Sequence, residues 1–191
     1  MGKRTKSKTA SKSEGHFSLL TDFDIHLFRS GKHFKLHEKL GSHLVTVDGK
    51  NGAYFAVWAP NAKRVSVIGN FNYWDANAHN LSPRWDESGI WEGFFPDVKK
   101  GEAYKYAIHS NTGELLEKAD PFARYCEPPP LTASIVWQSD YKWQDKKWLS
   151  KRKDVPAGTS KPYSVYEVHI GSWKKILHDN NRSLNFAELA R

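Results

Sequence analysis

The sequence predicts a mainly β protein organised around an antiparallel β-sandwich, and three observations point to this fold. Short apolar segments alternate with turn-forming residues from about residue 52 to residue 137. The candidate strand 54–59 is apolar on both faces, which suits a strand covered on both sides. The candidate strand 103–110 alternates large apolar residues with smaller or charged ones, the period of two expected of a strand. Short strands separated by turns are typical of a sandwich.

Composition indicates the class of protein. The chain has 191 residues, a hydrophobic content of 39% and a mean hydropathy of −0.69, which favour a soluble globular protein of one or two domains. No apolar segment approaches the roughly 18–20 residues that span a bilayer, and the polar N-terminus lacks the apolar stretch of a secretory signal. The single cysteine, Cys126, cannot form an intramolecular disulfide, which fits a reducing compartment. We therefore expect a cytoplasmic protein without a membrane partner.

The formal net charge of +8 raises the alternative of nucleic-acid binding, and its distribution argues against it. Residues 1–16 hold five basic side chains and one acidic one, so half of the excess lies in a tail rich in Ser, Thr and Lys. Such a tail cannot bury a core and is expected to be disordered. The remaining charge is spread over the rest of the chain, so we expect no specific nucleic-acid partner.

A helix and a connector are expected before the sandwich, over residues 17–51. Residues 21–30 read as the helix, capped by Thr21 or Asp22 and ended by Gly31. The segment that follows raises the alternative of a metal site, since it carries His33, His37, Glu38 and His43. The spacing is not that of the zinc motif H-E-x-x-H, so a packed connector with exposed histidines is favoured.

The strand candidates, in chain order, are 44–47, 54–59, 64–68, 81–84, 90–95, 103–110, 115–118 and 134–137. Those from residue 52 to residue 137 make up the predicted sandwich. A polar loop, residues 69–75 (GNFNYWD), has an aromatic residue at its tip. Because Trp combines an apolar face with a polar handle, such a loop on buried strands makes a platform for a flat, hydroxyl-rich ligand.

Residues 138–162 are expected to form a linker with a short basic helix that Asp145 can cap. The Pro, Gly, Ser and Thr content of residues 155–162 places a domain boundary there.

A second domain is expected to begin at residue 163. Residues 163–170 (YSVYEVHI) read as a new strand, and Asn185 with Glu188 forms a capping-box pattern that opens a helix. A strand and a helix without a next strand cannot form a core alone, so residues 163–191 look like the start of a truncated domain.

Several motifs together resemble a known family. FAVWAPNAKRVSVIGNFNYWD, GEAYKYAI and KADPFA are similar to the immunoglobulin-like starch- and glycogen-binding module that precedes the barrel of α-amylase-superfamily enzymes. TDFDIHLFRSGKHFKLHEKLGSH and YSVYEVHIGSW resemble bacterial 1,4-α-glucan branching enzymes. The resemblance implies an immunoglobulin-like β-sandwich followed by the first βα unit of a truncated (β/α)8 barrel.

The resemblance also implies an activity whose chemistry lies outside this chain. The family cleaves an α-1,4 linkage and transfers the released glucan to a 6-hydroxyl, through a covalent intermediate that needs an Asp nucleophile and a Glu acid/base. Both sit on later barrel strands, so no catalytic residue is assigned and the chain is expected to be inactive alone. Glu114, Glu117 and Asp120 read as a solvated edge, and neither these residues nor Glu167 is expected to be catalytic.

The resemblance further implies glucan-contacting residues in the sandwich. The Trp of the polar loop matches Trp74, with Asn72 beside it, and the Lys of the Y-K-Y strand matches Lys105. Trp91 is a weaker candidate. The hairpin 111–116, where strong binders of the family carry a second Trp, has no aromatic residue here. The implied partners are α-glucan and the rest of the barrel, and no metal or organic cofactor is implied.

Three alternatives stay open on the sequence. The module can serve mainly to pack against the barrel, with Trp74 in its own core or at a domain interface. The parent protein can be a related debranching or trehalose-forming hydrolase. The chain can also be a stand-alone, non-catalytic glucan-binding protein, although the strand and helix after residue 163 argue against this.

Overall fold

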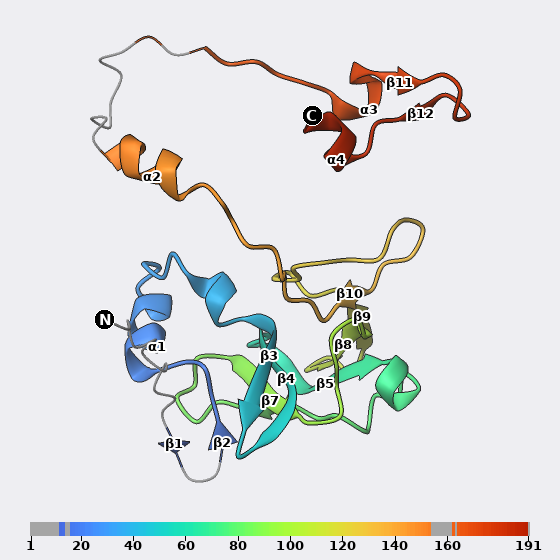
Figure 1. Ribbon diagram of the computed structural model, residues 1–191. Helices are drawn as coiled ribbons and strands as arrows, with labels where there is room; N and C mark the ends of the chain where they lie inside the picture. The colour runs from blue at the N-terminus through green and yellow to red at the C-terminus, as the bar shows by residue number, and fades with distance from the viewer. Residues whose placement is uncertain (1–11, 14–15, 154–161, 163, 191) are drawn as a thin grey trace. The chain divides into compact units, whose positions relative to one another are not determined.

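The computed structural model describes residues 12–13, 16–153, 162 and 164–190 (Figure 1). The chain divides into two compact units, one ending at Asp140 and the other beginning at Tyr141. Most of the predicted disordered tail and of the linker 155–162 lies outside the described residues, so both stay predictions. In the described part of the chain, every helix is too short or too polar to cross a membrane.

The first unit contains two four-stranded antiparallel sheets besides the short β1-β2 pair, which confirms the predicted mainly β fold. One sheet has the order β3-β4-β7-β6, with bounds Gly41–Val47, Lys50–Trp58, Ile90–Phe95 and Ser82–Pro83. In the other, β8 pairs with three strands, β5, β9 and β10; the bounds are β5 Ala62–Gly69, β8 Ala103–Ser110, β9 Leu115–Lys118 and β10 Ser134–Ile135. The predicted bounds of β7, β8 and β9 match those observed, and the predicted strand 44–47 extends back to Gly41.

The strands β4 and β5 are consecutive in sequence and belong to different sheets. β4 pairs with β3 and β7, whereas β5 pairs with β8. The short connection between them, closed by the hydrogen bond from the Ala62 N–H to the Ala59 carbonyl at 3.1 Å, therefore carries the chain from one sheet to the other. This step places the loop after β5 in the second sheet.

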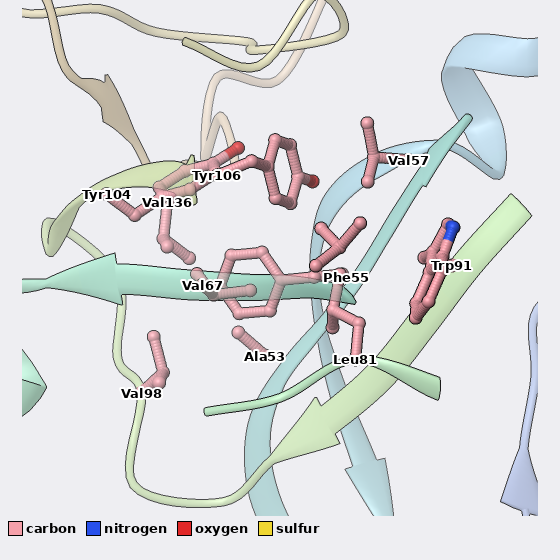
Figure 2. Packing of buried hydrophobic residues seen from close by; sticks show 11 residues of the cluster. Ala53, Phe55, Val57, Val67, Leu81, Trp91, Val98, Tyr104, Tyr106 and Val136 are labelled. Carbon is pink, nitrogen blue, oxygen red and sulfur yellow. The ribbon is translucent and has the colours of Figure 1, made fainter. Parts of the chain in front are cut away.

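The main core lies between the two sheets. Figure 2 shows inward side chains from both, among them Phe55 of β4, Val67 of β5 and Tyr106 of β8. Burying one such side chain stabilises a fold by about 1.5–3 kcal/mol. The alternation predicted for β8 is confirmed, because Tyr104 and Tyr106 both reach this core.

A second core covers the outer face of the β3-β4-β7-β6 sheet. Tyr54 and Ala56 of β4 point away from the sandwich interior and pack with Leu20, Ile25 and Leu40. These residues come from the segment that holds the helix α1 (Asp22–Arg29), which Figure 1 shows beside this sheet, and the short elements β1 (Lys12–Ser13), β2 (His16–Phe17) and η1 (Leu36–Glu38). Both faces of β4 are thus covered, and the N-terminal segment is a third layer of the same compact unit.

A buried ionic network fastens this layer to the sheet. Glu92 of β7, with 2% of its surface exposed, accepts hydrogen bonds from Arg84 Nη1 at 2.8 Å and from the Ser18 hydroxyl at 2.7 Å. The Tyr54 hydroxyl donates to the same carboxylate. Arg84 Nη2 has no hydrogen-bond partner among the described residues, and the guanidinium lies 4.4 Å from the centre of the Trp85 ring, whose π face attracts a cation.

The second unit contains short elements: α2 Lys146–Lys153, α3 Ile170–Trp173, β11 Lys175–Ile176, β12 Arg182–Ser183 and α4 Phe186–Leu189. The predicted basic helix is present as α2, and the Asn185–Glu188 capping box opens α4. The predicted strand 163–170 is not formed over its described residues, and Ile170 instead begins α3. A barrel strand needs neighbours for its backbone N–H and C=O groups, and no strand among the described residues pairs with this segment.

Candidate functional site

The candidate site lies where β5 ends. The 3₁₀ turn η2 (Asn70–Asn72) and the residues to Ala76 follow Gly69, whose cross-strand neighbour on β8 is Tyr104. Ser66, which points away from the core, donates from its hydroxyl to the Ala76 carbonyl at 2.7 Å, so the loop folds over the outer face of β5. Lys105 is opposite Ile68 on this same outer face. The loop and Lys105 therefore share one surface.

Trp74 is held in a fixed orientation at the tip of this loop. Its indole Nε1 donates to Asn70 Oδ1 at 3.0 Å, and its backbone N–H donates to the Gly69 carbonyl at 2.9 Å. The side chain is 39% exposed. Because the polar edge of the indole is bonded within the loop, the apolar ring surface is what Trp74 presents to a ligand.

The tip of the loop stores backbone strain. Tyr73 and Trp74 have φ values of 54° and 61°, so two successive residues with large side chains adopt the left-handed conformation that glycine favours. Each such residue costs of the order of 1–3 kcal/mol, and this kind of strain clusters at functional sites.

Asn72 stabilises the loop through side-chain hydrogen bonds to backbone groups. Its Oδ1 accepts from the Gly69 N–H at 2.9 Å, and its Nδ2 donates to the Val67 carbonyl at 2.9 Å. Only 7% of its surface is exposed. The sequence places Asn72 beside Trp74 as a glucan contact; in the structure its polar atoms are used inside the loop, so it positions Trp74.

The close packing of β5 on β8 explains the glycine that begins the loop. A Cβ atom at Gly69 would lie 2.3 Å from the Ala103 carbonyl oxygen and 2.5 Å from the Phe71 ring. Its φ of −178° is extended, so glycine is required here for space.

Lys105 is the cationic member of the site. It alternates with the inward-facing Tyr104 and Tyr106 along β8, so its side chain leaves the outer face of the sheet and is half-buried. In the described part of the chain, its ammonium takes part in no hydrogen bond or ion pair within the fold. It is available to donate to hydroxyl oxygens of a ligand.

Trp91 lies in the main core and on the other sheet. Figure 2 shows its ring among the core side chains. It is 8% exposed, and its indole Nε1 donates to the Ala59 carbonyl at 3.0 Å. The sequence offers it as a weaker glucan contact, and the structure places it apart from the surface shared by Trp74 and Lys105.

Asp120 corrects one expectation from the sequence. We expected Glu114, Glu117 and Asp120 to form a solvated edge; the two glutamates are exposed, but Asp120 is only 6% exposed. Its carboxylate accepts from the hydroxyls of Tyr104 and Tyr106. Burial raises the pKa of Asp120, and these hydrogen bonds offset part of the rise. The pattern E-K-A-D does not reveal this, because the tyrosines come from another strand.

The expectation of exposed histidines in the connector holds for His37 and is wrong for His33 and His43, whose rings are used within the fold. His33 Nε2 lies 2.9 Å from Asp24 Oδ1, and His43 Nε2 lies 2.9 Å from the Leu40 carbonyl oxygen. Among the described residues, no group of three or more His, Cys, Asp and Glu side chains gathers as metal ligands would.

Comparison with known proteins matches residues 39–123 to carbohydrate-binding module 48, the isoamylase N-terminal domain. The chain is 55% identical over 155 residues to the 1,4-alpha-glucan branching enzyme GlgB of Thermosynechococcus vestitus, covering 81% of this chain and 20% of that protein. It is 47% identical over 174 residues to GlgB of Aquifex aeolicus, covering 91% of this chain and 27% of that protein. It therefore spans between a fifth and about a quarter of the length of these relatives.

Among solved structures, the maltotriose complex of PulA from Klebsiella pneumoniae superposes with a TM-score of 0.42 at 26% identity. The match covers 52% of this chain and 11% of that one.

Proposed function

We propose that residues 39–123, which match carbohydrate-binding module 48, bind α-glucan within the N-terminal part of a 1,4-α-glucan branching enzyme. To the complete enzyme we assign the transfer of α-1,4-linked glucan segments to 6-hydroxyl groups, which makes the α-1,6 branches of glycogen. The curated relatives above are branching enzymes, which favours this reading over a debranching or trehalose-forming hydrolase.

One observation carries the proposal: the loop that holds the exposed Trp74 folds over the outer face of β5, and Lys105 lies on the same face of the neighbouring strand β8. A glucose ring has apolar C–H faces and a rim of hydroxyls. The indole covers such a face, and the ammonium donates to the rim. By analogy with bases stacked on aromatic side chains, one stacking ring contributes about 1–3 kcal/mol.

We give the other two predicted contacts different roles. Asn72 holds the loop in the conformation that presents Trp74. Trp91, on β7, packs in the core between the two sheets. The surface proposed to touch glucan is thus smaller than the set expected from the sequence.

We propose no catalysis by this chain alone. Asp120 is a buried acceptor for two tyrosine hydroxyls, and Glu188 pairs with Arg182 at 2.9 Å, so each has a structural role. The catalytic carboxylates are assigned to the part of the enzyme that follows. We further propose that residues 163–191 become the first strand and helix of the (β/α)8 barrel once neighbouring strands are present, with the capping box of α4 already formed.

Native gel electrophoresis of the 191-residue chain through glycogen tests the binding proposal. We expect Trp74→Ala to reduce retention, with an apparent dissociation constant raised about tenfold. Trp143→Ala is the matched control, since Trp143 is an exposed tryptophan of the second unit. Thermal melting verifies that both variants fold. Unchanged retention of a folded Trp74→Ala variant would overturn glucan binding in favour of a packing role for this face.

A further inference from the structure

We propose that Tyr73 is a second aromatic contact for α-glucan at the Trp74 surface; this inference rests on the proposed function. Tyr73 immediately precedes Trp74, and 95% of its surface is exposed. The phenol therefore packs on almost nothing in the fold. The sequence motif draws attention to the tryptophan, and the structure shows that the residue beside it presents more free ring surface.

The exposure of Tyr73 does not come from a loose loop. The backbone N–H of Trp74 donates to the Gly69 carbonyl at 2.9 Å, and that of Asp75 donates to the Asn72 carbonyl at 3.0 Å. The brace by Asn72 fixes the turn beneath them. A tyrosine on a rigid backbone has only two side-chain torsions left to order, so it offers contact area at a low entropic cost.

Stability alone does not explain a tyrosine at this position. With φ at 54°, residue 73 adopts a conformation that Gly and Asn accept readily and that a bulky side chain rarely adopts. A buried ring could offset that strain through packing, but this ring is in solvent. A ligand that covers the phenol accounts for both the residue type and its conformation.

Tyr73 and Trp74 are consecutive, and both have the φ values of a left-handed helical turn. Successive residues in a helical conformation are rotated by about 100°, compared with 180° in a strand. A glucan chain with one glucose on Trp74 can thus bring the next glucose against Tyr73, whose hydroxyl can bond to the sugar rim. The site then prefers linked glucose units over a single one.

Titration of the 191-residue chain with a series from glucose to maltoheptaose tests this inference. We expect Tyr73→Asn to weaken binding of the longer glucans about tenfold, with little effect on glucose. Because Asn tolerates the left-handed conformation, the same variant should melt at or above the temperature of the unmodified chain. Tyr73→Phe is the matched control; it keeps the ring and should retain most of the affinity.

The outcomes separate the two proposals. If Trp74→Ala leaves the affinity for all glucans unchanged, the proposed function fails. If Trp74→Ala weakens binding while Tyr73→Asn does not, glucan binding stands and the role of Tyr73 is overturned. A loss of affinity in Tyr73→Asn together with a lower melting temperature would indicate a structural role for Tyr73 and also contradict the inference.

Discussion

The hydroxyl of Tyr104 donates to Asp120 Oδ2 at 2.6 Å, and through this bond the chain that leaves β9 is fastened to the inner face of β8. Tyr106 donates to the same oxygen at 3.1 Å, and the Asp120 N–H donates to the Ser134 hydroxyl at 2.8 Å. Asp120 thus links β8 to the chain after β9 and to β10, both of which pair with the β8 edge opposite β5. It also holds β8 at the place where the strand presents Lys105 on its other face.

Replacing Asp120 should destabilise the first unit. In Asp120→Ala, two buried tyrosine hydroxyls lose their acceptor, and each unsatisfied buried group costs about 1–3 kcal/mol. We expect the free energy of unfolding, measured with urea, to fall by about 2–4 kcal/mol. Glu117→Ala on the exposed strand β9 is the control and should change it by less than about 0.5 kcal/mol. Equal stability of the two variants would contradict the anchoring role.

The raised pKa of Asp120 determines whether its contribution to folding stability rises or falls with pH. Because burial raises the pKa of Asp120 above its ordinary value of 3.8, its contribution to stability is full below pH 3.8 and is lost as pH rises through the folded-state pKa. Hydrogen bonds from the hydroxyls of Tyr104 and Tyr106 stabilise the charged carboxylate and so offset part of that loss.

Asp24 should show the opposite pH dependence. Burial opposes its charged form, but hydrogen bonds from Lys39, Thr21 and His33 outweigh burial and lower its pKa. The stability it provides is therefore present above pH 3.8 and is lost as pH falls through the folded-state pKa. We expect Asp24→Asn to lower the free energy of unfolding by about 1–3 kcal/mol at pH 7.

Chemical denaturation at a series of pH values measures this effect. The gap between Asp24→Asn and the unmodified chain should close as the pH falls below 3.8. Asp22→Asn, an exposed aspartate in the first turn of α1, is the control. A gap that stays constant over the whole series would show that the charge of Asp24 is not what stabilises this layer.

The sequence predicts correctly those strands that the hydrophobic periodicity of their own residues specifies. β7 and β8 have the expected bounds, and the two apolar faces of β4 are both buried, because periodicity is a local property. Which element covers the outer face of β4 could not be predicted, since it depends on the contact between Tyr54 and residues more than ten positions away. Residues 164–170 show the converse, because a strand-like pattern forms no strand without a neighbouring edge.

Some features of the candidate site could likewise be predicted from the sequence, and others could not. The exposed Trp in a polar loop and the outward Lys105 follow from loop composition and strand alternation. The role of Asn72 could not be predicted, because its partners are backbone groups of Gly69 and Val67 that become neighbours only when the turn closes. Tyr73 was missed because its conformation, and not its residue type, makes it unusual.

Removing the brace under the loop should weaken binding without touching the ligand. In Asn72→Ala, the Gly69 N–H and the Val67 carbonyl lose their side-chain partner. We expect faster amide hydrogen exchange over residues 70–75 and a dissociation constant for glucan raised to a similar extent as in Trp74→Ala. Asn77→Ala, an exposed residue beyond the tip, is the control. Weaker binding with unchanged exchange would instead make Asn72 a direct contact.

Removing one member of the buried Arg84–Glu92 ion pair should lower the free energy of unfolding more than replacing both members with apolar residues. Their atoms Nη1 and Oε1 are 2.8 Å apart, and both side chains are almost fully buried. Glu92→Leu removes the carboxylate bound to Nη1 and leaves Asp86, 2.9 Å from Nε, as the remaining ion-pair partner of the guanidinium, so we expect a loss of about 3–5 kcal/mol in urea unfolding. Arg84→Met with Glu92→Leu removes both charges, and such replacements are often neutral. We therefore expect the double variant to be more stable than Glu92→Leu alone. If the loss in free energy of unfolding of the double variant equals the sum of the losses of the two single variants, Arg84 and Glu92 act independently. The network with Ser18 and Tyr54 would then not join the N-terminal layer to the sheet as one unit.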